Sequence, residues 1–127
     1  MRFLTTAETV SHGEESAEYC REHYIDKQPF ALQAVHGSAS IKNGTLCVTV
    51  VNTHPTQETE LDLEVFCSKL GEAEVITLAA DDIHAHNTFE QPERVQLSAP
   101  RTVTAKGQAL RVALPAGSIT RIMGNIE

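Results

Sequence analysis

The chain has 127 residues, of which 41% are hydrophobic, and it carries a formal net charge of −7. This length fits one domain, and the apolar fraction supports a globular core and argues against disorder along the whole chain. The net charge opposes nucleic acid as a partner, because phosphate binding needs clustered Lys and Arg, and these residues are scattered singly.

The cysteine pattern bears on the compartment. Cys20, Cys47 and Cys67 form no C-x-x-C pair and are odd in number. A disulfide framework is therefore not expected, and reduced thiols in a cytoplasmic protein are the simpler interpretation. The first ten residues lack the apolar run of a signal peptide, and no stretch approaches the ~20 apolar residues that cross a bilayer, so we expect no membrane partner.

Residues 1–29 form an acidic leader that differs in character from the rest of the chain. Ser11 and Glu14 have the spacing of a capping box, which favours a short helix from about residue 14 to residue 24. The apolar positions in this stretch make only a thin stripe, which is also compatible with a mobile tail. The leader is therefore either helical or mobile, and Pro29 ends it and starts a second unit at residues 30–127.

After Pro29 the hydrophobic pattern takes a period of two, which is typical of strands. Asn43-Gly44 favours a type I′ hairpin, because both central residues of that turn need a positive φ. Leu46, Val48 and Val50 alternate along the next segment, and we expect them to point inward. The following segment also alternates. One face carries Leu61, Leu63 and Val65, and the other face carries a row of carboxylates, Glu60, Asp62 and Glu64.

Further strand patterns occur at residues 74–79, 103–105, 110–114 and 119–123, with glycine and proline turns between them. Short strands about 8–12 residues apart, without a βαβ rhythm, are typical of antiparallel sandwiches. The sequence therefore predicts an all-β fold, an antiparallel β-sandwich of jelly-roll type with seven or more strands.

Two motifs carry a resemblance to a known family. The first is a V-N-x-x-P turn made by Val51, Asn52 and Pro55. The second is an A-H-N-T-F-x-x-P loop within the segment DIHAHNTFEQPERV, with the residues Ala85, His86, Asn87, Thr88, Phe89 and Pro92. In this order they resemble the C-terminal β-sandwich of the α-L-arabinofuranosidases of glycoside hydrolase family 51, from about residue 30 to the C-terminus.

This resemblance implies a function without catalysis. Members of the family are retaining enzymes that remove terminal non-reducing α-L-arabinofuranosyl groups from arabinan and arabinoxylan. Their two catalytic glutamates lie in a barrel upstream of the sandwich, and no residue of this chain maps to them. The chain is therefore expected to be an accessory domain that packs on and stabilises a catalytic barrel. The family's sandwich is also completed by a strand from the extreme N-terminus of the enzyme, which residues 1–29 do not match.

The loop from His84 to Pro92 is the candidate interface. Phe89 supplies apolar area inside a polar loop, and its neighbours supply hydrogen-bonding groups; the candidate residues are His84, His86, Asn87, Thr88 and Phe89. We expect this loop to meet the catalytic barrel, or a second copy in a homodimer that forms through the loop or an open sheet edge. The alternative is that Phe89 caps the end of its own sandwich.

Metal binding and catalysis are weighed against simpler explanations. His84 and His86 have H-x-H spacing beside Asp81 and Asp82, but no third ligand cluster is evident, so neither a metal nor another cofactor is expected. The carboxylate row from Glu58 to Glu64 invites comparison with a glycosidase pair, but it forms the polar face of a half-buried strand, where burial does not raise an acid's pKa.

A carbohydrate-binding module is the remaining alternative. Such modules usually stack sugar rings on exposed Trp or Tyr. This chain has no Trp, and both tyrosines, Tyr19 and Tyr24, lie in the leader. The composition therefore favours a structural or interaction module over polysaccharide binding.

Overall fold

The computed structural model describes residues 2–4, 9–11, 31–66 and 68–127, and every regular element in these ranges is a strand. The strands are β1 (Arg2–Leu4), β2 (Thr9–Ser11), β3 (Ala31–Gln33), β4 (Val35–Lys42), β5 (Thr45–Asn52), β6 (Thr59–Glu64), β7 (Leu70–Ala79), β8 (Gln96–Leu97), β9 (Arg101–Thr104), β10 (Ala109–Leu114) and β11 (Ser118–Ile126). The all-β prediction is confirmed. The helix predicted near residues 14–24 lies outside the described residues.

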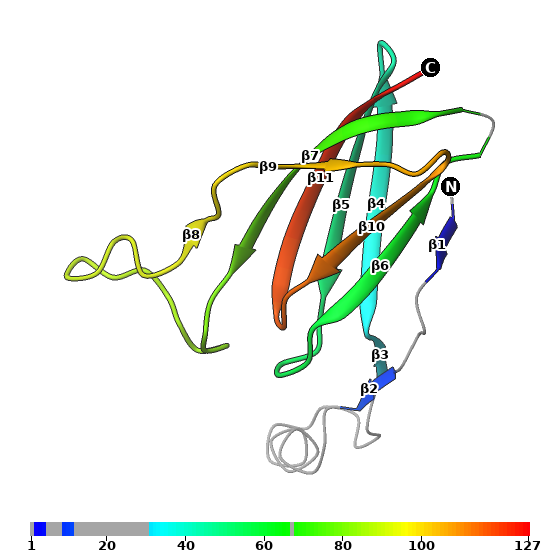
Figure 1. Ribbon diagram of the computed structural model, residues 1–127. Coiled ribbons are helices and arrows are strands. Elements are labelled where there is room, and N and C mark those ends of the chain that lie inside the picture. Colours follow the sequence, from blue (N-terminus) through cyan, green and yellow to red (C-terminus); the bar gives the residue numbers. More distant parts are fainter. Residues whose placement is uncertain (1, 5–8, 12–30, 67) are drawn as a thin grey trace.

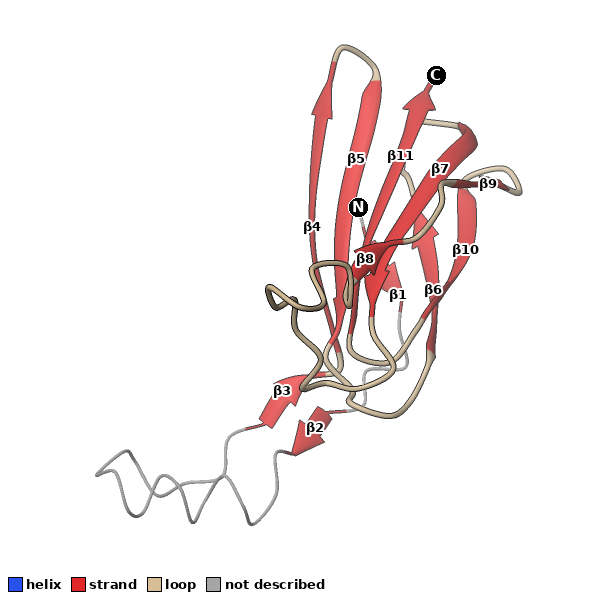
Figure 2. Cartoon of the chain, turned by 90° about the vertical axis from the view of Figure 1, so that its left-hand side faces the viewer, coloured by secondary structure: helices blue, strands red, loops and turns tan. Residues whose placement is uncertain are grey.

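Two antiparallel sheets face one another (Figures 1 and 2). The larger sheet has the order β4-β5-β11-β7-β8, and β9 also pairs with β7. The smaller sheet has the order β1-β6-β10, and β2 and β3 form a separate two-stranded pair. This arrangement is an antiparallel sandwich, and the jelly-roll connection remains a prediction.

The hairpin of β4 and β5 forms as the sequence predicts. Asn43 has a φ of 53° and Gly44 a φ of 76°, which are the positive values that a type I′ turn requires. The turn sets Lys42 opposite Thr45, and this register runs along the hairpin to Val35 and Asn52.

The core lies between the two sheets and is aliphatic. The larger sheet contributes the predicted inward residues Leu46, Val48 and Val50, each no more than 1% exposed. The smaller sheet contributes Leu61 and Leu63, and the other main members are Val75, Leu110, Val112, Leu114 and Ile122. Alternate residues of a strand point to opposite faces, so the period of two in the sequence becomes one buried face on each sheet.

The N-terminal segment contains strands that the sequence did not predict. β1 pairs antiparallel with β6, setting Phe3 opposite Leu63, and β2 pairs with β3. β1, β2 and β3 are each three residues long, which is too short for a period of two to be recognised. The boundary at residue 30 remains a prediction. No helix long and apolar enough to cross a bilayer occurs among the described residues.

Candidate interface

The predicted interface residues lie together on one loop, residues 80–95, which joins β7 to β8 and extends away from the body of the sandwich (Figure 1). Phe89 is fully exposed, so it does not cap the end of its own sandwich. His84, His86 and Asn87 are exposed as well, and Thr88 is half-buried.

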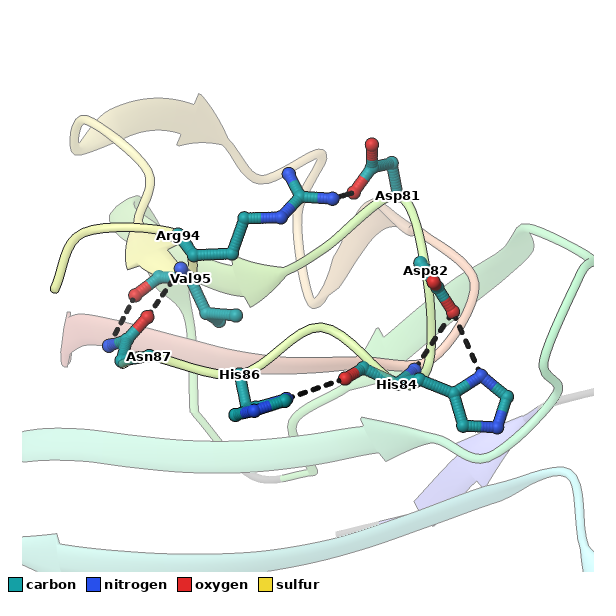
Figure 3. Close-up of polar contacts among 7 residues, drawn as sticks. All are labelled: Asp81, Asp82, His84, His86, Asn87, Arg94 and Val95. Carbon is teal, nitrogen blue, oxygen red and sulfur yellow. Dashed lines mark hydrogen bonds and ion pairs between the residues drawn. The ribbon is translucent and has the colours of Figure 1, made fainter. Parts of the chain in front are cut away.

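Hydrogen bonds close the loop at its base (Figure 3). The Asn87 side chain accepts a 2.7 Å hydrogen bond from the Val95 amide and donates a 3.2 Å bond to the Val95 carbonyl. The Arg94 guanidinium forms a 2.8 Å ion pair with Asp81. The Arg94–Asp81 pair joins the two ends of the loop, and the Asn87 bonds tie its middle to the arm that leads into β8.

A tight turn at the tip presents Phe89. The Thr88 hydroxyl accepts a 3.1 Å hydrogen bond from the Gln91 amide, and the Thr88 amide donates a 3.1 Å bond to the Gln91 carbonyl. Phe89 lies between these two residues with its side chain in solvent. Thr88 therefore has an internal role in holding the turn.

The two loop histidines do not converge on one point. His84 donates to Asp82 from its backbone amide and from Nδ1, at 2.9 and 3.1 Å. These hydrogen bonds, the backbone one first, lower the pKa of Asp82. His86 Nδ1 lies 2.9 Å from the His84 carbonyl oxygen, and Figure 3 shows the two rings pointing to different sides. Within the described ranges, no group of three or more His, Cys, Asp or Glu is placed to hold a metal ion.

An apolar row on the outer face of the larger sheet adds to this surface, and the sequence analysis missed it. Strand register places Val51, Ile119, Leu78 and Leu97 side by side across β5, β11, β7 and β8. Ile119 is 45% exposed and Leu97 is 66% exposed. The available signal was the apolar character of Val51 and Leu78, which lie where a solvated outer face would carry polar residues.

The apolar row leads into the base of the loop. Leu78 lies next to the last residue of β7, and its partner Leu97 ends β8, so the loop leaves and re-enters the sheet beside the row. Ile83, on the first part of the loop, is exposed and lies close to the Gly117 turn that precedes β11. We call the row, Ile83 and Phe89 together the docking surface. Exposed apolar side chains that gather at one end of a molecule are typical of interaction surfaces.

The turn that carries the first motif of the family resemblance lies near the start of the loop, with the Gly117 turn between them. Asn52 is buried, and its side-chain amide lies within 3.1 Å of the carbonyl oxygens of Gln57, Leu114 and Pro115. Its Oδ1 accepts from the His54 amide at 3.0 Å, and the His54 carbonyl accepts from Gly117 at 2.8 Å. Asn52 thereby joins the turn after β5 to the turn beside Ile83.

The carboxylate row lies on the outer face of the smaller sheet, away from the core. Arg111 donates to both Asp62 carboxylate oxygens, at 2.6 and 2.9 Å. These hydrogen bonds lower the pKa of Asp62, and Asp62 in turn raises the pKa of Arg111. A general acid needs a raised pKa, so the shift at Asp62 runs against an acid role in glycoside hydrolysis.

A shallow hollow of about 460 Å³ lies beside β7, β8 and β10. Polar side chains line part of it, including Glu58, Gln96, Ser98 and Arg101, and no aromatic side chain does. It therefore offers no ring on which a sugar would stack.

Comparison with known proteins gives a consistent assignment. The family model described as "Alpha-L-arabinofuranosidase C-terminal domain" matches residues 4–118, so the similarity begins earlier than the motifs suggested. A search among curated proteins finds no match. Similar solved structures include the GH51 arabinofuranosidase from Xanthomonas axonopodis pv. citri, with 26% identity over 93% of this chain and 21% of that chain, and a TM-score of 0.70.

Two further structures agree. The thermostable GH51 α-L-arabinofuranosidase from Thermotoga petrophila RKU-1 has a TM-score of 0.64, and the α-L-arabinofuranosidase from Thermotoga maritima, an arabinose complex, has a TM-score of 0.65. Each shares 26% identity over 78% of this chain and 21% of its own. The present chain therefore spans about a fifth of the length of the proteins it resembles.

Proposed function

The chain belongs to the family of α-L-arabinofuranosidase C-terminal domains, and we propose that it is the non-catalytic accessory β-sandwich of an α-L-arabinofuranosidase-like enzyme. In this proposal the sandwich packs on a catalytic barrel and stabilises it. The parent enzyme hydrolyses terminal non-reducing α-L-arabinofuranosides of arabinan and arabinoxylan with retention of configuration. The proposal is supported by the similar structures, in which the matched part is about a fifth of a longer chain.

The observation that carries the proposal is the docking surface. The outer face of a solvated antiparallel sheet is normally polar, whereas here an apolar row crosses four strands and ends on β8, where the loop that carries the exposed Phe89 re-enters the sheet. Burying one Phe side chain contributes about 1.5–3 kcal/mol, so Phe89 and the row together supply a substantial share of the stability of an interdomain contact.

The polar groups of the loop complement this apolar area. His86 and Asn87 use part of their hydrogen-bonding capacity within the loop, and their exposed side chains lie close to Phe89 along the chain. A hydrophobic centre with a polar rim is the usual anatomy of a protein interface. The barrel surface that meets it is accordingly expected to be apolar at its centre.

Two alternatives remain for the same chain. Without a barrel, the exposed Phe89 favours self-association as a homodimer through the docking surface. Polysaccharide binding has weaker support, because the hollow beside β7 and β8 lacks aromatic residues. We also propose a cytoplasmic location for the enzyme, on the grounds of the unpaired cysteine pattern.

A domain-replacement experiment tests the proposal. The C-terminal domain of the Xanthomonas axonopodis pv. citri arabinofuranosidase is replaced by this chain, and the melting temperature and arabinofuranosidase activity are compared with those of the barrel alone. We expect the replacement to raise both. Phe89→Ser and Leu97→Ser should each reduce the gain.

The control is Glu60→Gln, which lies on the outer face of the smaller sheet, remote from the docking surface, and should leave the gain unchanged. A chimera that is no more stable than the bare barrel would contradict the accessory role. Variants at Phe89 and Leu97 that behave like the control would show that the barrel meets another face.

A further inference from the structure

Within the described part of the chain, the larger sheet has an open edge along β4, an eight-residue strand without proline. Among the residues that the structure describes, β4 pairs with β5 and with no other strand. An open edge presents a row of backbone N–H and C=O groups to any strand that approaches it. Natural edges are usually protected by inward-pointing charges, bulges or proline, and β4 carries none of these at its centre.

The backbone geometry shows which residues of β4 are open. The Thr53 amide donates a 2.9 Å hydrogen bond to the Ala34 carbonyl, so Ala34 and Thr53 form a hydrogen-bonded pair. The next pair along the hairpin is Val35 and Asn52. Because hydrogen-bonded and non-bonded positions alternate, the even-numbered residues of β4 bond to β5. The odd-numbered residues therefore direct their backbone groups outward: Val35, Gly37, Ala39 and Ile41.

The same residues carry the inner face of β4, and that face is uncovered. Gly37, Ala39 and Ile41 lie opposite the buried residues Val50, Val48 and Leu46 of β5, so they share the core side of the sheet. Ile41 is nevertheless 60% exposed, and Gly37 and Ala39 are exposed as well. Figure 1 shows the turn end of the β4–β5 hairpin rising beyond the ends of β6 and β10, which agrees with the exposure of Ile41 beside the turn.

From these observations we propose that a second copy of this chain adds to β4 through antiparallel pairing of the two β4 edges. This inference concerns a different surface from the docking surface and does not depend on the proposed function. A two-fold axis through Ala39 sets Ala39 opposite Ala39 of the partner subunit and Gly37 opposite Ile41 of the partner subunit. All of these residues have outward backbone groups, so the pairing supplies roughly six backbone hydrogen bonds.

Side-chain packing and charge favour a second copy as the occupant. In this register the large Ile41 lies beside a glycine, so the inner faces of the two strands meet without a clash and bury Ile41. The chain carries a net charge of −7, yet β4 contains no acidic residue, only His36 and Lys42 near its ends. The outer face of the smaller sheet, with Glu60, Asp62 and Glu64, would repel its own copy.

Amide hydrogen exchange on the full chain tests the pairing without any substitution. The amides of Gly37, Ala39 and Ile41 should exchange freely in dilute solution and become protected as concentration rises. The amides of Ser38 and Ser40, already bonded to β5, should stay protected throughout. Light scattering over the same range should show a monomer–dimer equilibrium. A strict monomer at the highest concentration, or unchanged exchange at the three odd-numbered amides, would overturn the proposal.

Substitutions then assign the dimer to β4. Ala39→Pro removes an N–H that points away from β5, so it should abolish the dimer while circular dichroism shows the fold retained. Ala39→Lys places two like charges opposite one another on the inner face of the pairing, so it should also abolish the dimer. The matched control Ser38→Lys points to the outer face and should leave the dimer intact. Phe89→Ser should also leave it intact, and loss of the dimer in that variant would overturn the assignment to β4.

Discussion

At the scale of single residues, Asn52 and Phe89 belong to the two motifs that carry the family resemblance. Their environments are opposite. Asn52 is 1% exposed and contacts three carbonyl groups and one amide. Phe89 has no such contacts and stands in solvent. Asn52 therefore serves the fold of this chain, whereas Phe89 is available for a partner.

Replacing Asn52 by Ala should destabilise the domain. The substitution removes the side-chain hydrogen bonds to the Gln57, Leu114 and Pro115 carbonyls and the acceptor of the His54 amide, and each buried group left unsatisfied costs about 1–3 kcal/mol. We expect a loss of at least about 2 kcal/mol in the free energy of unfolding, measured by urea denaturation. Asn125→Ala is the matched control, because its side chain accepts from Thr45 at the exposed surface. Equal losses in the two variants would contradict the role assigned to Asn52.

The Asp62–Arg111 pair should give the domain an acid-sensitive contribution to stability. The hydrogen bonds from Arg111 lower the pKa of Asp62 from 3.8 in the folded state, so folding favours the Asp62 carboxylate. The contribution is fully present above the unfolded value of 3.8 and is lost as the pH falls through the lower folded value.

Denaturation of the wild type and of Asp62→Asn over a range of pH measures this contribution. The difference between the two should be constant near neutrality and shrink below pH 3.8. In an Arg111→Gln background the shrinkage should be much reduced, because the donor that lowers the pKa is gone. The same acid dependence in both backgrounds would show that another group causes it.

At the scale of elements, the loop of residues 80–95 is shaped by its own polar contacts. The reciprocal bonds of Asn87 with Val95 and the Arg94–Asp81 pair join its two arms. A loop closed in this way presents Phe89 with little further ordering, which lowers the entropic cost of docking.

The substitution Asn87→Ala should loosen this loop and leave the sandwich intact. The Val95 amide loses its acceptor, so its hydrogen exchange should accelerate, whereas amides of β5 and β11 should not change. Thr88→Ala is the companion variant, and it should accelerate exchange at Gln91 instead. If Val95 stays protected in Asn87→Ala, the loop is held by contacts other than the reciprocal pair.

At the scale of the whole molecule, the carboxylate row on the described part of the chain is not arranged as glycoside hydrolysis needs. Glu60, Asp62 and Glu64 lie on the outer face of the smaller sheet, where Asp62 has a lowered pKa and is already paired with Arg111. A retaining mechanism requires one carboxyl with a raised pKa and a second at about 5–5.5 Å, both facing a bound sugar. The lowered pKa of Asp62 runs against this requirement.

The purified chain should therefore show no hydrolysis of an aryl α-L-arabinofuranoside. The measurement is release of the aryl alcohol at high protein concentration, with a full-length GH51 enzyme as the positive control. Turnover that persists through purification and disappears in Glu60→Gln or Glu64→Gln would show that the carboxylate row is catalytic after all.

The sequence by itself determined the local features of this protein. The period of two along β5 and β6 identified their buried residues, and Asn43-Gly44 identified the hairpin, because alternation and a positive φ are properties of neighbouring residues. The loop motif likewise placed Phe89 among polar residues and pointed to the family that the chain belongs to.

Only the tertiary structure decided which surfaces are left open. Val51, Ile119, Leu78 and Leu97 are far apart in the chain, and strand register alone brings them into one row. β4 shows the same limit: Ile41 follows the alternation of a core residue, yet it is exposed because the smaller sheet does not reach it. Burial depends on what lies across from a strand, and pairing between distant segments, which no local pattern encodes, fixes that.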